Sequence, residues 1–163
     1  GDSLGPWTVC HPADGDRFSR ADDGALVLAG NFHGARVLLL SDLGRVGQDA
    51  LLERTPDLRA DIVVAGLPTQ AEPLCEALLD AIQPRLLVVA GSEFPASERA
   101  SVKLRERLAQ RNVPVLCTHS AGAVTMEFRR SGWQVRAMNG ARFTSGDPAP
   151  KPTPAPPQDS SRE

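Results

Sequence analysis

The chain has 163 residues, of which 41% are apolar and 23% charged, which is enough for one hydrophobic core but too few for two ordinary domains. The chain has five Phe, two Trp and no Tyr, which are too few aromatic rings for a surface that stacks a row of nucleic-acid bases. The formal net charge is −2, and no apolar run reaches the roughly 18 residues that a membrane span needs, so this segment itself is expected to be soluble.

The histidines and cysteines do not form a recognised metal motif. Three of each are scattered along the chain without a C-x-x-C, H-x-H or H-E-x-x-H pattern, which excludes structural zinc and zincin-type sites within this stretch. Because a disulfide scaffold normally has an even number of cysteines, Cys10, Cys75 and Cys117 are interpreted as small buried apolar residues.

The composition divides the chain into a globular body, residues 1–146, and a tail. Residues 147–163 hold six of the fourteen prolines, and no residue among them is larger than proline and apolar. This composition predicts a disordered tail.

The apolar pattern in the first part of the body predicts antiparallel strands. Trp7–His11 is a short strand candidate, and the Pro, Gly and Asp content of 12–16 predicts a loop. Ala25–Ala29 and Arg36–Leu40 are apolar runs on either side of a Gly- and Asn-containing turn at Gly30–Gly34, which predicts a hairpin.

From Asp61 onward the apolar pattern changes to near-continuous runs, which predict buried parallel strands. The runs are Ile62–Ala65, Leu86–Val89 and Val113–Cys117, and they are separated by helical stretches at 72–82 and 97–110. This alternation predicts a βαβαβ unit with right-handed crossovers.

After this unit the chain returns to strict alternation. Ala123–Phe128 and Trp133–Val135 are joined through residues 129–132, which predicts a second hairpin. The overall prediction is a mixed sheet with helices on one side.

The segment Cys117–Gly122 is similar to the strand-to-helix elbow G-x-S-x-G of hydrolases, with Ser120 in the place of the nucleophile. Two facts count against this assignment, since the pattern after Ser120 alternates instead of opening a helix and no histidine follows His119. We favour a tight strand connection in which Gly122 takes a conformation that a Cβ would forbid.

Two loops carry acidic residues without a complete site. The stretch Val37–Gly47 runs from a strand through a Gly-bearing turn to a helix start, but it lacks both G-x-G-x-x-G and G-K-[ST]. Asp42 lies at the carboxyl end of that strand, where it can serve as a metal ligand or, as we favour without further ligands, cap a helix or form a turn. The stretch His11–Asp16 has no ligand spacing and is interpreted as a solvated loop.

Positive charge is concentrated between Arg99 and Arg142, where nine Lys or Arg face two Glu. Basic residues recur every four positions along the helix predicted at 97–110 and just beyond it, and they form a positive stripe of Arg99, Lys103, Arg107 and Arg111. Such a stripe could face DNA phosphates, although a plain solvated face is the favoured interpretation.

A series of short motifs follows in a fixed order along residues 7–140. They are Val9-Cys-His-Pro12, Leu39-Leu-Ser-Asp-Leu43, Ala60-Asp-Ile-Val-Val-Ala-Gly-Leu-Pro-Thr-Gln70, Ile82-Gln-Pro84, Ser92-Glu-Phe-Pro-Ala-Ser97 and Thr118-His-Ser-Ala-Gly-Ala-Val124. In order and spacing this series resembles the C-terminal metallo-β-lactamase-like domain of ComEC, the DNA-internalisation competence protein family. The resemblance implies the C-terminal portion of an α/β fold, the metallo-β-lactamase-like αββα sandwich.

The departures from that family concern its metal centre, whose bound hydroxide would attack a phosphodiester. Asp42 matches the bridging Asp of the family's T-G-D motif, but Leu67 and Pro68 stand where a His pair is expected, and neither side chain can bind a metal. Thr69 and Gln70 replace the following G-S, Pro95-Ala-Ser97 lies where a loop His-Pro is expected, and the H-x-H-x-D-H motif, which would precede residue 1, is absent from the chain. The resemblance therefore implies a degenerate metal site and no cofactor.

The expected role is that of a non-catalytic domain, structural or DNA-guiding, in a membrane protein that takes up DNA. Its partners would be the membrane channel and other segments of the same parent protein, with DNA held only through phosphates and no small-molecule substrate. The domain would be membrane-associated through its parent and lie outside the cytoplasm.

Two alternatives remain open. One is a metal-dependent hydrolase of the same fold that combines Asp42 with upstream ligands around zinc or manganese. The other is an unrelated α/β interaction module. The module predicts a complete independent fold, whereas a partial sandwich predicts an exposed sheet face.

Overall fold

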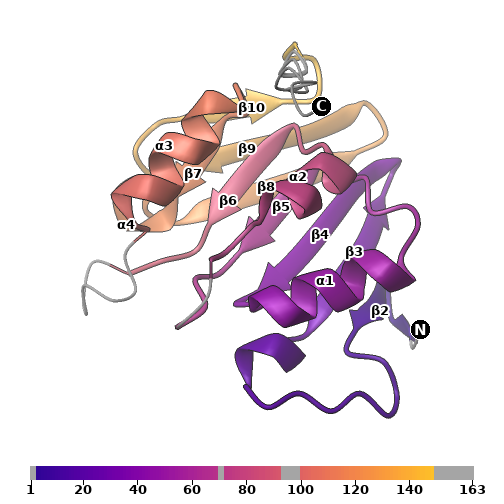
Figure 1. Ribbon diagram of the computed structural model, residues 1–163. Coiled ribbons are helices and arrows are strands. Elements are labelled where there is room, and N and C mark those ends of the chain that lie inside the picture. Colours follow the sequence, from indigo (N-terminus) through magenta and orange to yellow (C-terminus); the bar gives the residue numbers. More distant parts are fainter. Residues whose placement is uncertain (1–2, 70–71, 93–99, 149–163) are drawn as a thin grey trace, which may run out of the picture.

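The structure is a computed structural model that describes residues 3–69, 72–92 and 100–148. A mixed sheet of seven strands lies at its centre, with its strands in sequence order (Figure 1). They are β1 (Ser3–Leu4), β2 (Trp7–His11), β3 (Val27–Phe32), β4 (Ala35–Ser41), β5 (Ile62–Ala65), β6 (Leu86–Val89) and β7 (Val115–Cys117). Strands β1 to β4 pair antiparallel, and β4 to β7 pair parallel.

The predicted hairpin between β3 and β4 is present, but its turn is shorter than expected. Strand β3 continues to Phe32, and only His33 and Gly34 form the turn, with φ angles of 53° and 90°. Gly30 lies inside the strand, and the rings of Trp7 and Phe32 come within 2.7–2.8 Å of the place that a Cβ would occupy. This glycine makes room for aromatic packing and does not mark a turn.

The predicted parallel unit is confirmed, with β5 and β6 at the expected residues. Each crossover contains a helix, namely α1 (Arg45–Arg54), α2 (Glu76–Ile82) and α3 (Val102–Gln110), so β4 also belongs to the parallel part. The helices are shorter than predicted at their N-termini. Helix α3 begins after Ser101, whose Oγ accepts a hydrogen bond from the Leu104 N–H at 3.0 Å, while the predicted start at Ser97 lies outside the described residues.

One face of the sheet carries the helices, and Figure 1 shows α1, α2 and α3 on that face. Their buried residues form a core with the strand residues that point to the same side. Leu51, Leu78 and Leu108 represent the three helices, and each is at most 1% exposed. The helix face therefore supplies the larger of the two apolar cores.

The opposite face packs against a second, antiparallel sheet of three strands in the order β10-β9-β8. Strands β8 (Val124–Arg129) and β9 (Gly132–Ala137) are the hairpin predicted from the sequence, and β10 (Arg142–Thr144) was not predicted. Trp133 and Val135 fill the space between the sheets. Arg85 lies 5.6 Å from the Trp133 ring and donates to the carbonyls of Ser145 and Asp147, which fastens the small sheet to the start of β6.

These layers define the fold class as α/β, with a mixed sheet and a separate antiparallel sheet. The outer face of the small sheet is polar, since its outward positions include Thr125, Glu127, Arg129, Gln134 and Arg136. None of the described helices covers this face, so the described residues form three layers, one fewer than an αββα sandwich.

The body and the predicted tail meet just after β10. Asp147, the first residue of the predicted tail, still belongs to a turn in which its carboxylate accepts from the Thr144 N–H. The remainder of the tail, from 149 on, lies outside the described residues. Among the described helices, none has the length and apolar character of a membrane span.

Asp57, in the connection between α1 and β5, provides a test of surface electrostatics. Arg36 Nη1 lies 3.0 Å from one carboxylate oxygen and Arg59 Nε lies 3.2 Å from the other. Hydrogen bonds from Arg36 first and Arg59 second lower the pKa of Asp57 from 3.8 to about 2.

We expect Asp57→Asn to be less stable than the wild type at neutral pH and the difference to shrink in acid. Because the folded-state pKa lies below the unfolded one, the stabilisation is complete above about pH 5 and is lost as the pH falls through about 2. Urea unfolding midpoints measured between these limits test this, with Asp14→Asn as the exposed control. A difference independent of pH would contradict the assignment.

Candidate functional site

The carboxyl ends of β4 to β7 lie at one edge of the sheet, where parallel α/β folds commonly place functional groups. Asp42 lies at this edge directly after Ser41, which has a positive φ of 50°. The Ser41 hydroxyl lies 3.2 Å from an Asp42 carboxylate oxygen, and the Ser41 carbonyl accepts from the Gly66 N–H of the next loop. The Asp42 carboxylate is partly exposed and is held in a turn.

Among the described residues, no group of three or more His, Cys, Asp or Glu is placed to hold a metal ion. The positions of the expected His pair hold the apolar residues Leu67 and Pro68. Leu67 packs against the helix-side core, and Pro68 is buried. Thr69 donates its N–H to an Asp22 carboxylate oxygen at 2.8 Å. Gln70 and the segment Pro95–Ser97 lie outside the described residues. The described side chains do not fit the family's metal centre.

The N-terminus of α1, which follows the Gly-bearing turn at the end of β4, is occupied by a carboxylate of the chain itself. Asp23, in the short 3₁₀ helix η1 (Asp22–Gly24), accepts from the Val46 N–H at 3.2 Å and is 5% exposed. A Cβ at Gly44 would lie 2.4 Å from the same carboxylate, and one at Gly47 would lie 2.4 Å from the Asp23 carbonyl. Because Gly44 and Gly47 have no side chain, Asp23 can approach closely enough to cap the N-terminus of α1.

His11 anchors this cap, and the prediction of a solvated loop was wrong for this residue, which is fully buried. Its Nδ1 lies 3.3 Å from Arg54 Nη2, and its Nε2 lies 2.8 Å from the Asp23 carbonyl. Because a guanidinium can only donate, Nδ1 is the acceptor and the Nε2–H donates to Asp23. Arg54 also bonds the Asp16 carboxylate at 2.8 Å, which ties loop 12–21 to α1.

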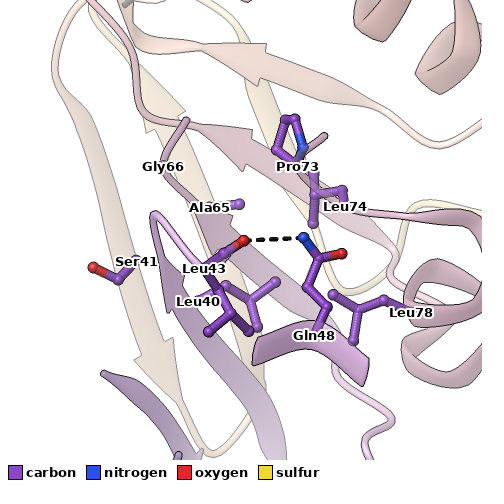
Figure 2. A pocket seen from close by; sticks show the side chains of 9 residues that line it. All are labelled: Leu40, Ser41, Leu43, Gln48, Ala65, Gly66, Pro73, Leu74 and Leu78. Carbon is purple, nitrogen blue, oxygen red and sulfur yellow. Dashed lines mark hydrogen bonds between the residues drawn. The ribbon is translucent and has the colours of Figure 1, made fainter. Parts of the chain in front are cut away.

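Gln48 joins two loops at the edge and was missed from the sequence. It is 1% exposed; its Nε2 donates to the carbonyls of Leu43 and Glu72, and its Oε1 accepts from the Cys75 N–H, all at 2.9–3.0 Å. Figure 2 shows this amide beside a cavity between β4, β5 and the start of α2. The cavity is about 10 Å³, which is at most the space of one water molecule and excludes an organic substrate there.

The segment that is similar to a hydrolase elbow forms the four-residue helix α4 (Thr118–Ala121). Ser120 Oγ donates to the Cys117 carbonyl at 3.2 Å, while Thr118 Oγ1 exchanges hydrogen bonds with the Gly91 backbone at 2.9 and 3.0 Å. Gly122 has a φ of 72°, and a Cβ there would lie 2.9 Å from that of Met138. The tight connection predicted at Gly122 is confirmed, and the bonds between Thr118 and Gly91 hold the ends of β6 and β7 together.

The basic stripe on α3 is largely engaged with α2. Arg107 donates to the carbonyls of Pro73 and Leu74 at 2.8 and 2.7 Å and to Glu76 at 3.0 Å. Its Nε also lies 3.2 Å from a Glu72 carboxylate oxygen, without the alignment of a hydrogen bond. The side chain is only 15% exposed, so Arg107 fastens the β5–α2 loop to α3.

Arg111 continues this network by pairing with Glu76 and Asp80, one turn apart on α2. Burial alone would raise the pKa of Glu76, but hydrogen bonds from Arg111 and Arg107 outweigh burial and lower this pKa. Burial likewise opposes the charge of Arg111, and its bonds to Glu76 and Asp80 nevertheless raise its pKa. Lys103 is exposed, and Arg99 lies outside the described residues. The four predicted DNA contacts therefore do not act as one free surface in the described part of the chain.

The three cysteines are free thiols. Cys75 is buried, as predicted, and Cys10 and Cys117 are partly buried. Burial is the largest influence on both of these and raises the pKa of each thiol. A raised pKa disfavours the nucleophilic thiolate, so the structure provides no activated cysteine among these residues.

One feature of the sequence could have revealed the internal cap. Helix α1 begins after Gly44 without a Ser, Thr, Asp or Asn at its N-cap position, so the acceptor for its first N–H groups must come from elsewhere. The identity of that acceptor, Asp23, cannot be predicted from local spacing.

No family model matches the chain, and no curated protein matches it.

The α2–α3 network gives a direct test of the basic stripe. We expect Arg107→Ala to lower the free energy of unfolding by about 2 kcal/mol, because it leaves loop carbonyls and carboxylates without their charged donor. Lys103→Ala, at an exposed position of the same helix, should change it by less than about 0.5 kcal/mol. Chemical denaturation of both variants measures this; equal effects would show that Arg107 has no special structural role.

Proposed function

We propose that this chain is a non-catalytic α/β domain with a structural role in a larger membrane protein that takes up DNA, as the resemblance to the ComEC family implies. The observation that carries the non-catalytic part is the chemistry at the carboxyl edge of the sheet. Asp42 is held there by Ser41, and Leu67 and Pro68 occupy the positions of the expected His pair.

The neighbouring polar groups favour the same proposal because each has a structural partner. Asp23 caps α1, Asp22 bonds the Thr69 N–H, and the Gln48 amide links two loops. A hydrolase needs ligands or a general base with free lone pairs directed at a substrate. The bonds of these three side chains stabilise loops and leave the hydrolase alternative dependent on residues upstream of this chain.

A metal titration tests the non-catalytic proposal. We expect calorimetry with zinc and with manganese to show no stoichiometric binding by the chain, and Asp42→Ala to behave like the wild type, because one carboxylate is a weak site for either ion. The fold should be unchanged in the variant. Stoichiometric binding that Asp42→Ala abolishes would overturn the proposal in favour of the hydrolase.

An electrostatic contact with DNA is a second candidate, and the outer face of the small sheet favours it over helix α3. Arg136 and Arg142 are direct cross-strand neighbours, and Arg129 and Arg130 lie at the β8–β9 turn. Glu127 pairs with Arg129 and Arg136, while Arg130 and Arg142 are exposed. A face with this excess of guanidinium groups suits a phosphate backbone without base readout.

We expect the chain to bind labelled duplex DNA weakly at low salt and to lose affinity as salt is raised, because phosphate contacts release counterions. Arg130→Glu combined with Arg142→Glu should weaken binding at least about tenfold, whereas Lys103→Glu should change it less than about twofold. Fluorescence anisotropy measures these affinities. Binding that is insensitive to salt, or that Lys103→Glu alone abolishes, would exclude the small sheet as the contact.

A further inference from the structure

The sheet face opposite the helices is covered unevenly. Val9, Leu28, Leu39 and Val64 are in register across β2, β3, β4 and β5, and the row continues into Val88 and Leu116. Val88 and Leu116 are buried under the small sheet, whereas the first four side chains are each partly exposed. These four residues are called the apolar row.

The apolar row extends beyond the packed core. Leu39 and Val64 touch the core between the two sheets, but Val9 and Leu28 belong to neither core cluster. The alternation of β3, continued back by one residue, places Leu26 on the same face, and Leu26 is 45% exposed. An apolar strip that runs out from beneath a covering layer indicates a surface that another element can cover.

Strand β8 borders this uncovered area. Phe128 of β8 stacks on Phe32 of β3 with ring centroids 4.9 Å apart, whereas the β9 and β10 side of the small sheet is fastened to Arg85 at the start of β6. Strand β8 is therefore the edge of the small sheet nearest to β3 and β4, as the arrangement in Figure 1 also indicates.

The backbone of β8 is open along that edge in the described part of the chain. The Met138 N–H donates to the Ala123 carbonyl, which makes Ala123 and Met138 a hydrogen-bonded pair. The constant register then makes every second residue of β8, namely Thr125, Glu127 and Arg129, bond toward β9. The N–H and C=O groups of Val124, Met126 and Phe128 then point to the open side. Strand β8 has six residues, a constant register, no proline and no bulge, so neither a missing N–H nor a kink interrupts its edge, and its charged residues, Glu127 and Arg129, lie on the outward face.

We propose that the open edge of β8 and the apolar row together form a docking site for an extended strand of a partner protein. Main-chain hydrogen bonds to Val124, Met126 and Phe128 extend the small sheet, and alternate apolar side chains of the partner strand cover the apolar row. The other side chains of that strand are polar, since they continue the face of Thr125 and Glu127.

Continuity with the small sheet and the chemistry of the apolar row both favour this occupant. The docked strand extends a sheet that already covers the adjacent part of the same face, and the apolar row carries only valine and leucine, which offer nothing to a charged or polar ligand. The proposal does not depend on the proposed function, because neither DNA nor a metal enters it. The docking site is the apolar row beside β8, whereas the metal test concerns Asp42 at the carboxyl edge of the sheet.

The test uses the full chain and a fluorescent peptide about nine residues long, in which valine and threonine alternate between terminal lysines. A peptide of the same composition with a central proline is the control, because proline cannot complete the ladder. We expect saturable binding of the first peptide in fluorescence anisotropy and at least about tenfold weaker binding of the second.

Variants on the two faces make the test specific. Leu28→Lys places a charge in the apolar row at a residue outside both cores and should weaken binding at least about tenfold, and Met126→Pro removes an edge N–H with the same effect. Thr125→Lys, on the outward face of β8, should leave the affinity unchanged within about twofold, and circular dichroism confirms that each variant is folded. Absence of saturable binding, equal binding by Leu28→Lys and Thr125→Lys, or a wild-type dimer that Leu28→Lys dissociates would overturn the proposal, the last by showing that a second copy occupies the site.

Discussion

The carboxylate of Asp23 at the N-terminus of α1 is the interaction on which the arrangement of the first half of the chain depends. It supplies the acceptor that the helix lacks in its own sequence, and its close approach requires glycine at position 44, while the Asp23 carbonyl requires glycine at position 47. The carbonyl of the same residue accepts from His11, which Arg54 holds from the other side. A single segment between β2 and β3 thereby fixes α1 against the sheet and joins the antiparallel hairpin to the parallel unit.

This use of polar side chains explains the chemistry at the carboxyl edge. In many parallel α/β proteins the loops at that edge direct free polar groups toward a ligand. Here Gln48, Asp22 and Thr118 bond to the backbone of neighbouring loops. A buried polar group that has its full set of partners stabilises one loop arrangement and has little capacity left for a substrate. The small cavity beside Gln48 is one result of this bonding, since the amide joins the loops that line it.

The two faces of the large sheet differ in the way they are covered. Three helices cover the whole width of the parallel part on one face, and their charged residues pair with one another, as Arg107 and Arg111 do with Glu76. Among the described residues, the other face is covered by a three-stranded sheet, whose polar outer surface faces away from the core. The apolar row beside β8 results from this difference in width, and it makes this side of the molecule the one suited to an interaction.

The parallel unit and the second hairpin were predictable from the amino-acid sequence, because buried apolar runs and strict alternation report on burial at each position. It also located the strained glycine at 122, since few side chains tolerate that conformation. The roles of Asp23, His11, Gln48 and Arg107 depend on tertiary contacts, since their partners, apart from Leu43 beside Gln48, lie 12 to 43 residues away in the chain. Local spacing favoured a solvated His11 loop and a solvated basic stripe, because it contains no information on which carbonyl or carboxylate folding will bring beside a side chain.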